Sequence, residues 1–164
     1  MMQLRKLSRH DGMDVFEMLK GIQGVENSYT NPTYEMTFEE FKKWLLVQEQ
    51  WDRGEELPPG YVAQSVFWLF DEDKPVGMGK IRHGLTEESR KNGGNIGYAI
   101  SLPYRGKGYG SILLKMLIDE AKRIGVEEIL LTIDMGNNAS KSVCEKNGGI
   151  LFDKNQDRYY YRFD

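Results

Sequence analysis

The sequence predicts an α/β fold with a mostly antiparallel central sheet that contains one parallel strand pair. Residues 60–70 and 76–84 are strand-like runs separated by the turn DEDKP, and they predict an antiparallel hairpin. The apolar run 95–102, the long amphipathic helix after it and the buried run 127–134 predict a strand–helix–strand crossover, which joins parallel strands. Residues 149–164 predict a closing hairpin.

Length and composition predict a single domain spanning residues 1–164. The 164 residues are 40% hydrophobic, which is enough for a packed core, and the formal net charge of −3 gives no general attraction to nucleic acid. No apolar run approaches the roughly 20 residues that a membrane-spanning helix needs, and the amino terminus lacks a signal-peptide core. The single cysteine, Cys144, suits a reducing compartment. We therefore expect a cytoplasmic protein that binds neither nucleic acid nor membrane.

The amino-terminal part of the chain predicts one strand and two helices. Residues 3–7 predict a short strand, and residues 11–23 place apolar side chains at helical spacing. Residues 37–51 predict a second helix, because they open with the capping-box pattern TFEE before an apolar stripe. The polar segment 27–36 between the helices predicts a loop.

Glycines mark the boundaries of the elements that follow. Gly77 and Gly79 predict a β-bulge in the second strand of the hairpin, and residues 85–94 predict a polar loop. Gly125 stands where the long amphipathic helix is expected to end, and residues 137–148 predict a short helix that also ends in glycine.

The loop RGKGYG, residues 105–110, carries the clearest chemical signal. Glycine at every second position removes Cβ atoms from the turn, and Arg105 and Lys107 add positive charge. The amino terminus of the following helix exposes unpaired N–H groups and the positive end of the helix dipole, which favours a phosphate. We expect a pyrophosphate site here, and the alternative is a tight turn that needs glycine and binds nothing.

Two other phosphate-binding motifs fit the loop less well. The P-loop string GxxxxGK[ST] is absent, which argues against a nucleotide triphosphatase. The Rossmann motif requires GxGxxG and an acidic residue further on, whereas this loop reads GxGxG, although Asp134 ends the next strand. A dinucleotide fold also begins with its glycine loop and repeats βαβ units, so a nucleotide-dependent oxidoreductase is the last-ranked alternative.

The loop and its neighbours resemble the GNAT superfamily of N-acetyltransferases. The signature of that family is Arg or Gln, two residues, Gly, one residue, then Gly or Ala, and Arg105, Gly108 and Gly110 match it. The strand NIGYAISL, the loop, the long helix, the strand EILLTID and a helix beginning with Asn follow the order of the family. The segments KIRHGL, GGNIGYAI and NNASKSVCEKNGG are similar to a subgroup of predicted acetyltransferases with an unassigned acceptor. The resemblance implies a three-layer α/β/α fold with the parallel strand pair at the cofactor cleft.

The resemblance also implies acetyl-coenzyme A (acetyl-CoA) as the cosubstrate and no metal. Backbone groups of Ile100, Ser101 and Leu102 are expected to contact the pantetheine arm and to polarise the thioester carbonyl. The loop amides are expected to hold the pyrophosphate, which agrees with the electrostatic argument above. The loop residues implied in this role are Arg105, Gly106, Lys107, Gly108, Tyr109, Gly110 and Ser111.

The helix 137–148 matches the family in one position and departs from it in another. Asn137 corresponds to the family asparagine that touches the pantetheine, and helical spacing puts Ser140 and Cys144 on the same face, which we expect to face the cofactor. Many members have a tyrosine as general acid where this chain has Cys144, and a phenylalanine where it has Gly149. Cys144 is therefore a candidate acid, and the alternative is a small buried residue with water or another tyrosine as the proton donor.

His83, at the end of the predicted strand 76–84, is the candidate general base. Histidine titrates near neutral pH, so it is suited to take a proton from an ammonium group. The alternative is a strand-end histidine that caps a loop.

The function we expect is transfer of an acetyl group from acetyl-CoA to a primary amine of a small molecule or peptide, directly in a ternary complex. The alternative is a non-catalytic coenzyme A-binding regulatory module, which the cysteine at position 144 motivates. The sequence carries no motif for the acceptor and is compatible with a homodimer.

Overall fold

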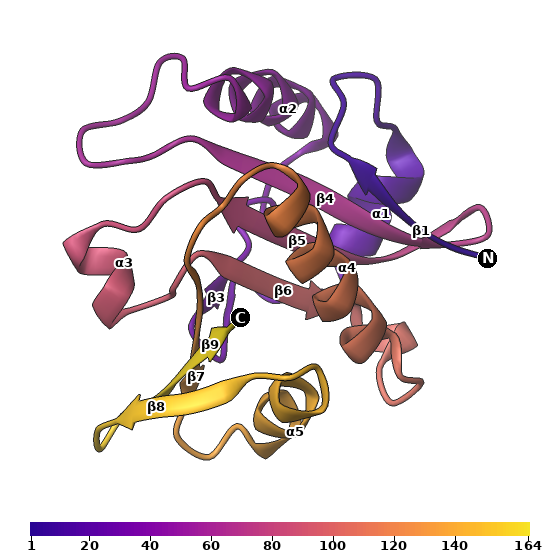
Figure 1. Ribbon diagram of the computed structural model, residues 1–164. Helices are drawn as coiled ribbons and strands as arrows, with labels where there is room; N and C mark the ends of the chain where they lie inside the picture. The colour runs from indigo at the N-terminus through magenta and orange to yellow at the C-terminus, as the bar shows by residue number, and fades with distance from the viewer.

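The computed structural model describes the whole chain, residues 1–164 (Figure 1). In chain order, its strands and helices are β1 (Met2–Lys6), α1 (Met13–Leu19), β2 (Val25–Glu26), β3 (Tyr29–Thr30), α2 (Phe38–Asp52), β4 (Gln64–Asp71), β5 (Lys74–Arg82), α3 (Glu87–Lys91), β6 (Ile96–Ile100), a 3-10 turn (Leu102–Tyr104), α4 (Tyr109–Arg123), β7 (Ile129–Asp134), α5 (Asn138–Lys146), β8 (Ile150–Lys154) and β9 (Arg158–Phe163).

Four strands form the main sheet in the order β1-β4-β5-β6, and each neighbouring pair is antiparallel. The β4–β5 hairpin confirms the predicted antiparallel pair. Leu69 pairs with Gly77, but the next residue, Phe70, pairs with Pro75, so one residue of β5 is left over between them. The irregularity therefore lies next to Gly77 and does not include Gly79, which differs from the predicted bulge at both glycines. Gly79 has a different reason, because a Cβ at this position would lie 2.6 Å from Cδ1 of Leu117 in α4. The glycine therefore lets the long helix pack closely on the sheet.

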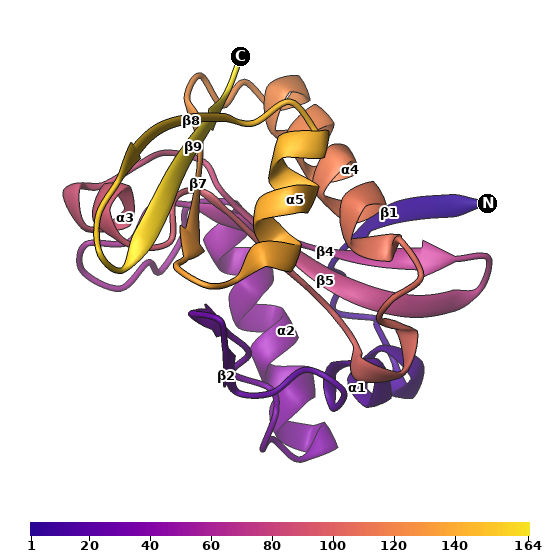
Figure 2. The same ribbon diagram turned by 90° about the horizontal axis from the view of Figure 1, so that it is seen from below.

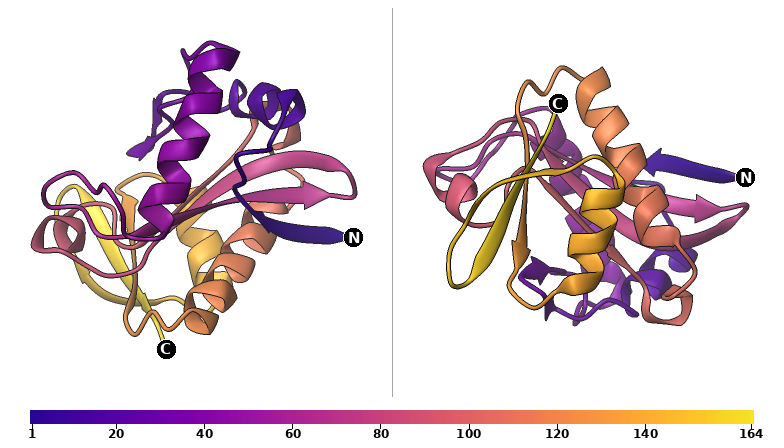
Figure 3. Two further views of the ribbon diagram at one scale, coloured as in Figure 1. Left: turned by 90° about the horizontal axis from the view of Figure 1, so that it is seen from above. Right: turned by 60° about the horizontal axis from the view of Figure 1, so that its bottom comes forward.

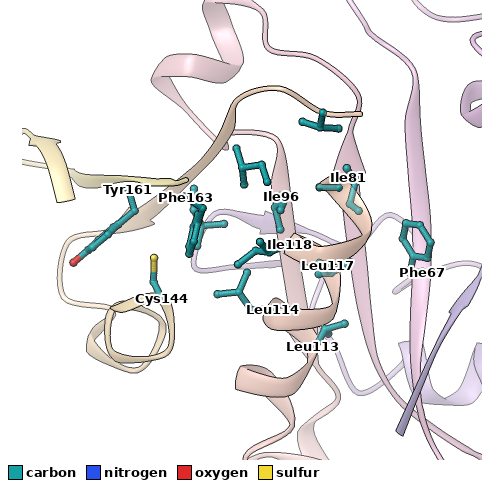
Figure 4. Close-up of a cluster of buried hydrophobic side chains, with 14 of the residues drawn as sticks. Phe67, Ile81, Ile96, Leu113, Leu114, Leu117, Ile118, Cys144, Tyr161 and Phe163 are labelled. Carbon is teal, nitrogen blue, oxygen red and sulfur yellow. The ribbon is translucent and has the colours of Figure 1, made fainter. Parts of the chain in front are cut away.

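Helices cover both faces of the main sheet, which gives the three layers that the resemblance implied (Figure 3, left). On one face, α1 and α2 pack over Trp68 and Met78. On the other face, α4 packs over Ile81 and Ile96, as the close-up shows (Figure 4). In comparable cores, truncating a large buried side chain such as Leu117 of α4 lowers the free energy of unfolding by about 2–5 kcal/mol.

The ends of the two long helices follow from local sequence. Thr37 caps α2 as predicted, because its hydroxyl accepts from the N–H of Glu40 at 3.2 Å and its own N–H donates to the Glu40 carboxylate at 2.9 Å. Gly125 follows α4 with a φ of +88°, a left-handed conformation that favours glycine after a helix. None of the helices combines the length and the apolar character needed to cross a bilayer.

The carboxy-terminal strands form a second antiparallel sheet in the order β7-β9-β8. The two sheets meet at Asn95, which directly precedes β6 and is fully buried. Its N–H donates to the Leu130 carbonyl at 3.0 Å, its Nδ2 donates to the Glu128 carbonyl at 2.6 Å, and its Oδ1 accepts from the N–H of Leu130 at 2.9 Å. The Asn95 side chain thus makes the two hydrogen bonds that a peptide unit of a neighbouring strand would make. No parallel ladder joins β6 and β7, so the predicted parallel strand pair is not confirmed as a hydrogen-bonded pair.

Two short elements lie in segments for which the sequence predicts loops. The β2–β3 hairpin falls within residues 27–36 and the two residues before them, and α3 falls within residues 85–94. Thr86 caps α3 by accepting from the N–H of Ser89 at 3.0 Å. Both elements are too short for hydrophobic periodicity to reveal them.

Candidate active site

A cavity of about 640 Å³ lies where the two sheets diverge. Strand β6 and residues 131–134 of β7 form two of its walls. The first turn of α4, one face of α5 and the β2–β3 hairpin complete it. Figure 2 shows α4 and α5 side by side, with β7 next to α5. The amino-terminal ends of both helices therefore contribute to one cavity.

The glycine loop presents unpaired main-chain N–H groups to this cavity. The first hydrogen bond of α4 runs from the N–H of Ile112 to the carbonyl of Gly108, so residues 109–111 have no helical partner for their N–H groups. The N–H groups of residues 106–108 also make no hydrogen bond within the protein. Gly108 has a φ of +86°, and a Cβ there would meet no atom within 4 Å. An open array of donors at a helix amino terminus fits a diphosphate.

The charges of the loop are placed differently from the expectation. Arg105 donates through Nη1 and Nη2 to the carboxylate of Glu26 at 2.5 and 3.0 Å, and through Nε to the carbonyl of Ile100 at 2.9 Å. Lys107 does not line the cavity, and its Nζ lies 6.0 Å from the ring centroid of Tyr104. The donors that face the cavity are therefore main-chain groups, with the charge of Arg105 already paired.

Of the three residues at the end of β6 for which the resemblance implied backbone contacts, only Ile100 lines the cavity. The N–H of Ser101 donates to the Val76 carbonyl and that of Leu102 to the Gly21 carbonyl, both at 2.9 Å. Neither residue lines the cavity, so the structure does not support the contacts predicted for Ser101 and Leu102. Ile100 does line the cavity. Because alternate N–H groups of a strand point to opposite edges, its N–H points away from β5 and toward the open edge.

Helix α5 turns one face to the cavity, as expected, but Cys144 is not on it. Asn137 caps the helix by accepting from the N–H of Ser140 at 3.3 Å, and both side chains line the cavity. The lining continues through Val143 and Lys146. Cys144 points into the core beside α4 and is fully buried (Figure 4).

Burial raises the pKa of the Cys144 thiol to about 12. A Cβ at position 149 would lie 2.5 Å from Sγ of Cys144, which explains why glycine follows this helix. The structure thus places Cys144 as a small core residue, the alternative weighed above, and does not support its predicted role as an acid.

His83 lies outside the cavity, so the structure does not support its predicted role as a base. Its Nε2 is 2.7 Å from the hydroxyl oxygen of Ser65, and that hydroxyl donates to Asp52. Asp52 also pairs with Nζ of Lys6 at 2.6 Å. The serine stands between the histidine and the aspartate, which differs from a nucleophilic triad, where the histidine is central. Burial lowers the pKa of His83, so it is mostly neutral at pH 7.

Tyr98 on β6 is a site residue that the sequence analysis missed. Its ring lines the cavity, and its hydroxyl oxygen is buried without a hydrogen-bond partner. The hydroxyl lies beside Ser140 of α5, and Cε2 of the ring is 3.7 Å from the Cβ position of Gly110. Burial raises the pKa of Tyr98. An aromatic residue in an apolar strand is usually a core residue, so nothing in the sequence distinguishes it.

The fold, the cavity and the free N–H groups beside it are those expected of an acyltransferase that uses a diphosphate-bearing acyl carrier. The model of the Acetyltransferase (GNAT) family matches residues 25–149. The chain therefore belongs to the GNAT family of acetyl-CoA-dependent acetyltransferases. No curated protein matches the sequence.

Solved structures with this fold cover nearly the whole chain. RimL, a ribosomal L7/L12 alpha-N-protein acetyltransferase in complex with coenzyme A, has a TM-score of 0.72 at 17% identity, over 98% of this chain and 92% of that chain. Campylobacter jejuni N-acetyltransferase PseH, in complex with acetyl coenzyme A, has a TM-score of 0.66 at 13% identity, over 100% and 99%. A spermidine N-acetyltransferase SpeG chimera from Vibrio cholerae and hSSAT has a TM-score of 0.65 at 17% identity, over 99% and 94%. At these identities the similarity concerns the fold.

Proposed function

We propose that this protein transfers an acetyl group from acetyl-CoA to a primary amine of a small molecule or peptide, directly in a ternary complex. The observation that carries the proposal is the row of free N–H groups from residue 106 to residue 111, at the point where β6 and β7 diverge. A diphosphate at this row satisfies donors that the protein itself leaves unpaired. Family membership and coenzyme A bound to similar folds support the same carrier.

Different residues of the cavity are expected to bind different parts of the carrier. The N–H groups of the glycine loop bind the diphosphate, and the free edge of β6 offers main-chain groups to the extended pantetheine arm. Asn137 and Ser140 border the same cavity from α5. Acetyl-CoA supplies the activated acetyl group and, in its thiolate, the leaving group. We expect the N–H of Ile100 to donate a hydrogen bond to the acetyl oxygen, where charge develops.

The reaction also requires two proton transfers, one from the ammonium group of the acceptor and one to the leaving thiolate. The amine attacks only when it is neutral, and a positive environment lowers the pKa of an ammonium group. Lys80 and Arg82 line the cavity and supply that environment. We expect the hydroxyl of Tyr98, which borders the cavity beside Ser140, to donate a proton to the leaving thiolate. This tyrosine on the strand then replaces the tyrosine that many family members carry on the helix, at the position of Cys144.

Similar folds act on amines of different kinds, namely the ribosomal protein L7/L12 and spermidine according to their names. These names support an amine acceptor and leave its class open. A panel of amines tests the proposal directly. Purified protein is titrated with coenzyme A by calorimetry, and thiol release from acetyl-CoA is followed with each amine.

The proposal requires saturable binding of coenzyme A and amine-dependent thiol release. Coenzyme A binding with no amine-dependent release from a broad panel would instead support the non-catalytic regulatory module. Absence of coenzyme A binding would contradict both functions.

A further inference from the structure

Strand β5 carries two basic side chains on the side of the cavity that lies away from the glycine loop. Ile81 packs against α4, so its neighbours Lys80 and Arg82 point to the opposite face of the sheet. That face is covered by α1, α2 and the β2–β3 hairpin, and both basic side chains line the cavity there. We call Lys80, Arg82 and Tyr29 of the hairpin the acceptor-side cluster.

Neither basic side chain has an acidic partner. Nζ of Lys80 donates to the carbonyl of Thr30 at 2.9 Å and lies 5.1 Å from the ring centroid of Tyr29. Nη1 of Arg82 donates to the carbonyl of Gly94 at 2.7 Å, and its other side-chain N–H groups have no partner. Neither takes part in an ion pair, so the cluster presents uncompensated positive charge to the cavity.

Tyr29 adds a third donor to the cluster. Its hydroxyl oxygen is buried and has no hydrogen-bond partner in the protein. It lies close enough to Arg82 for the two groups to interact electrostatically, and it lines the same cavity. A buried hydroxyl without a partner is unusual in a folded protein, and a ligand oxygen at this point would satisfy it.

The carboxylates that line the cavity are engaged by other groups. Glu26 binds Arg105 through both carboxylate oxygens, at 2.5 and 3.0 Å. Asp134 accepts from the hydroxyl of Ser28 at 2.9 and 2.8 Å and lies 3.8 Å from Nε of Arg158. The charge of the acceptor-side cluster is therefore left for a ligand.

We propose that the acceptor is an amine that also carries an anionic group, a carboxylate or a phosphate, and that the acceptor-side cluster binds this group. The inference rests on the proposed function, because it names the acceptor class of the same cavity. Arginine and lysine supply charge-assisted hydrogen bonds to such oxygens, and the tyrosine hydroxyl supplies a neutral one.

The position of the cluster suits a compact acceptor. Lys80 pairs with Gly97 across the β5–β6 ladder, and Met78 pairs with Ala99, next to the proposed acetyl position at Ile100. Residues two apart in a strand are separated by about 7 Å, so the Cα atoms of Lys80 and Arg82 lie about 7 and about 14 Å along β5 from Met78. An acceptor bound by Lys80 is therefore a small molecule or peptide end whose amine and anionic group are a few bonds apart, whereas one that reaches Arg82 is longer.

The same charges disfavour polyamines. A second ammonium group in this part of the cavity would lie beside two cations, and like charges repel strongly where water is partly excluded. Burial, and after it the positive charge of Arg82, lower the pKa of Lys80 to about 8. Lys80 is thus still mostly protonated at pH 7, and a bound anion would favour its charged form further.

Matched amines test the proposal. Thiol release from acetyl-CoA is measured with glycine against glycinamide, γ-aminobutyrate against butylamine and phosphoethanolamine against ethanolamine, with spermidine as the polycationic amine. We expect the anionic member of at least one pair to have a kcat/KM at least tenfold above that of its neutral partner, with spermidine poorest. The carboxylate and phosphate pairs distinguish the two anionic groups.

Three variants test whether the cluster is responsible. We expect Arg82→Gln and Lys80→Gln to lower kcat/KM about tenfold more for the anionic amine than for its neutral partner, with unchanged affinity for coenzyme A. Tyr29→Phe keeps the ring and removes only the unpaired hydroxyl, so it should give a smaller loss in the same direction. Lys43→Gln, on an exposed face of α2, is the charge-matched control and should change nothing.

The failures of the two proposals differ. If coenzyme A does not bind, the proposed function fails and this inference fails with it. If amines are acetylated but neutral or polycationic ones are preferred, only the anionic acceptor is overturned. It is also overturned if Arg82→Gln and Tyr29→Phe, both folded by circular dichroism, lower the rates of anionic and neutral amines equally.

Discussion

Glu26 and Arg105 form a two-bonded ion pair that links the β2–β3 hairpin to the glycine loop. The two residues are far apart in the chain and both line the cavity. Their pair places a carboxylate beside the N–H groups that are proposed to bind a diphosphate. The hairpin therefore influences the charge of the proposed phosphate site without contributing a donor to it.

Glu26→Gln is expected to tighten coenzyme A binding severalfold. The change removes a negative charge near the proposed diphosphate and frees the guanidinium of Arg105. A partly exposed pair contributes only about 0–1 kcal/mol to stability, so Tm should change little. Calorimetry at low and high salt checks this, because the gain should shrink as salt increases. Glu55→Gln, which breaks the exposed ion pair with Arg53, is the control. If Glu26→Gln instead binds coenzyme A more weakly, the Glu26–Arg105 pair is needed to hold the glycine loop in shape, and the prediction is wrong.

Gly108→Ala is expected to weaken coenzyme A binding at least tenfold. The added Cβ would project into open space at the cavity, where the diphosphate must approach the main chain. Gly125→Ala is a matched control at the other end of α4, because Gly125 also has a positive φ, +88° against +86°, and open space around it. An alanine in this left-handed conformation lowers the free energy of unfolding by about 1–2 kcal/mol, so Tm should fall by about 2–4 °C or more in both variants. Equal coenzyme A affinity in the two variants would contradict the phosphate site.

Tyr98→Phe is expected to lower kcat about 10- to 100-fold with little change in the KM for acetyl-CoA. The variant keeps the ring that lines the cavity and removes the proposed proton donor. Burial raises the pKa of Tyr98 above its ordinary value near 10, so the hydroxyl stays protonated throughout the neutral range. In the wild type, kcat should therefore not fall with rising pH until above about pH 10. A pH–kcat profile that falls with a midpoint near pH 8, or full activity in Tyr98→Phe, would show that another group donates the proton. Tyr61→Phe, which changes an exposed tyrosine, is the control.

The parts of the site that depend on local sequence were predictable. The glycine loop presents main-chain N–H groups of consecutive residues, so its spacing and its place before a helix are sufficient to predict these open N–H groups. The capping box of α2 and the end of α4 at Gly125 were confirmed for the same reason.

The parts that depend on which face a side chain occupies were not predictable. His83 and Arg82 are adjacent in sequence, but Arg82 lines the cavity, whereas His83 bonds to Ser65. On α5, Val143 lines the cavity and its neighbour Cys144 is buried in the core. In both cases the sequence identified the correct element, and a displacement of one residue changed the environment of the side chain completely.

Asn95→Ala is expected to lower the free energy of unfolding by about 2–4 kcal/mol and to weaken coenzyme A binding. The side chain of Asn95 bonds to the Glu128 carbonyl and the Leu130 N–H at the point where the sheets meet, so its removal leaves a buried N–H and a part-buried carbonyl without partners. Asn31→Ala is the matched control, because Asn31 is also buried and donates to two main-chain carbonyls, yet lies away from the junction of β6 and β7.

Both asparagine variants should lose stability, but only Asn95→Ala should accelerate amide hydrogen exchange at Leu130 relative to the rest of β7. The reason is that the Asn95 side chain fixes the distance between β6 and β7 at the closed end of the cavity, while the remainder of both strands is separated by the space that the carrier is proposed to enter. If exchange at Leu130 rises no more in Asn95→Ala than in Asn31→Ala, the cavity is held open by the packing of α4 and α5 and not by this single side chain.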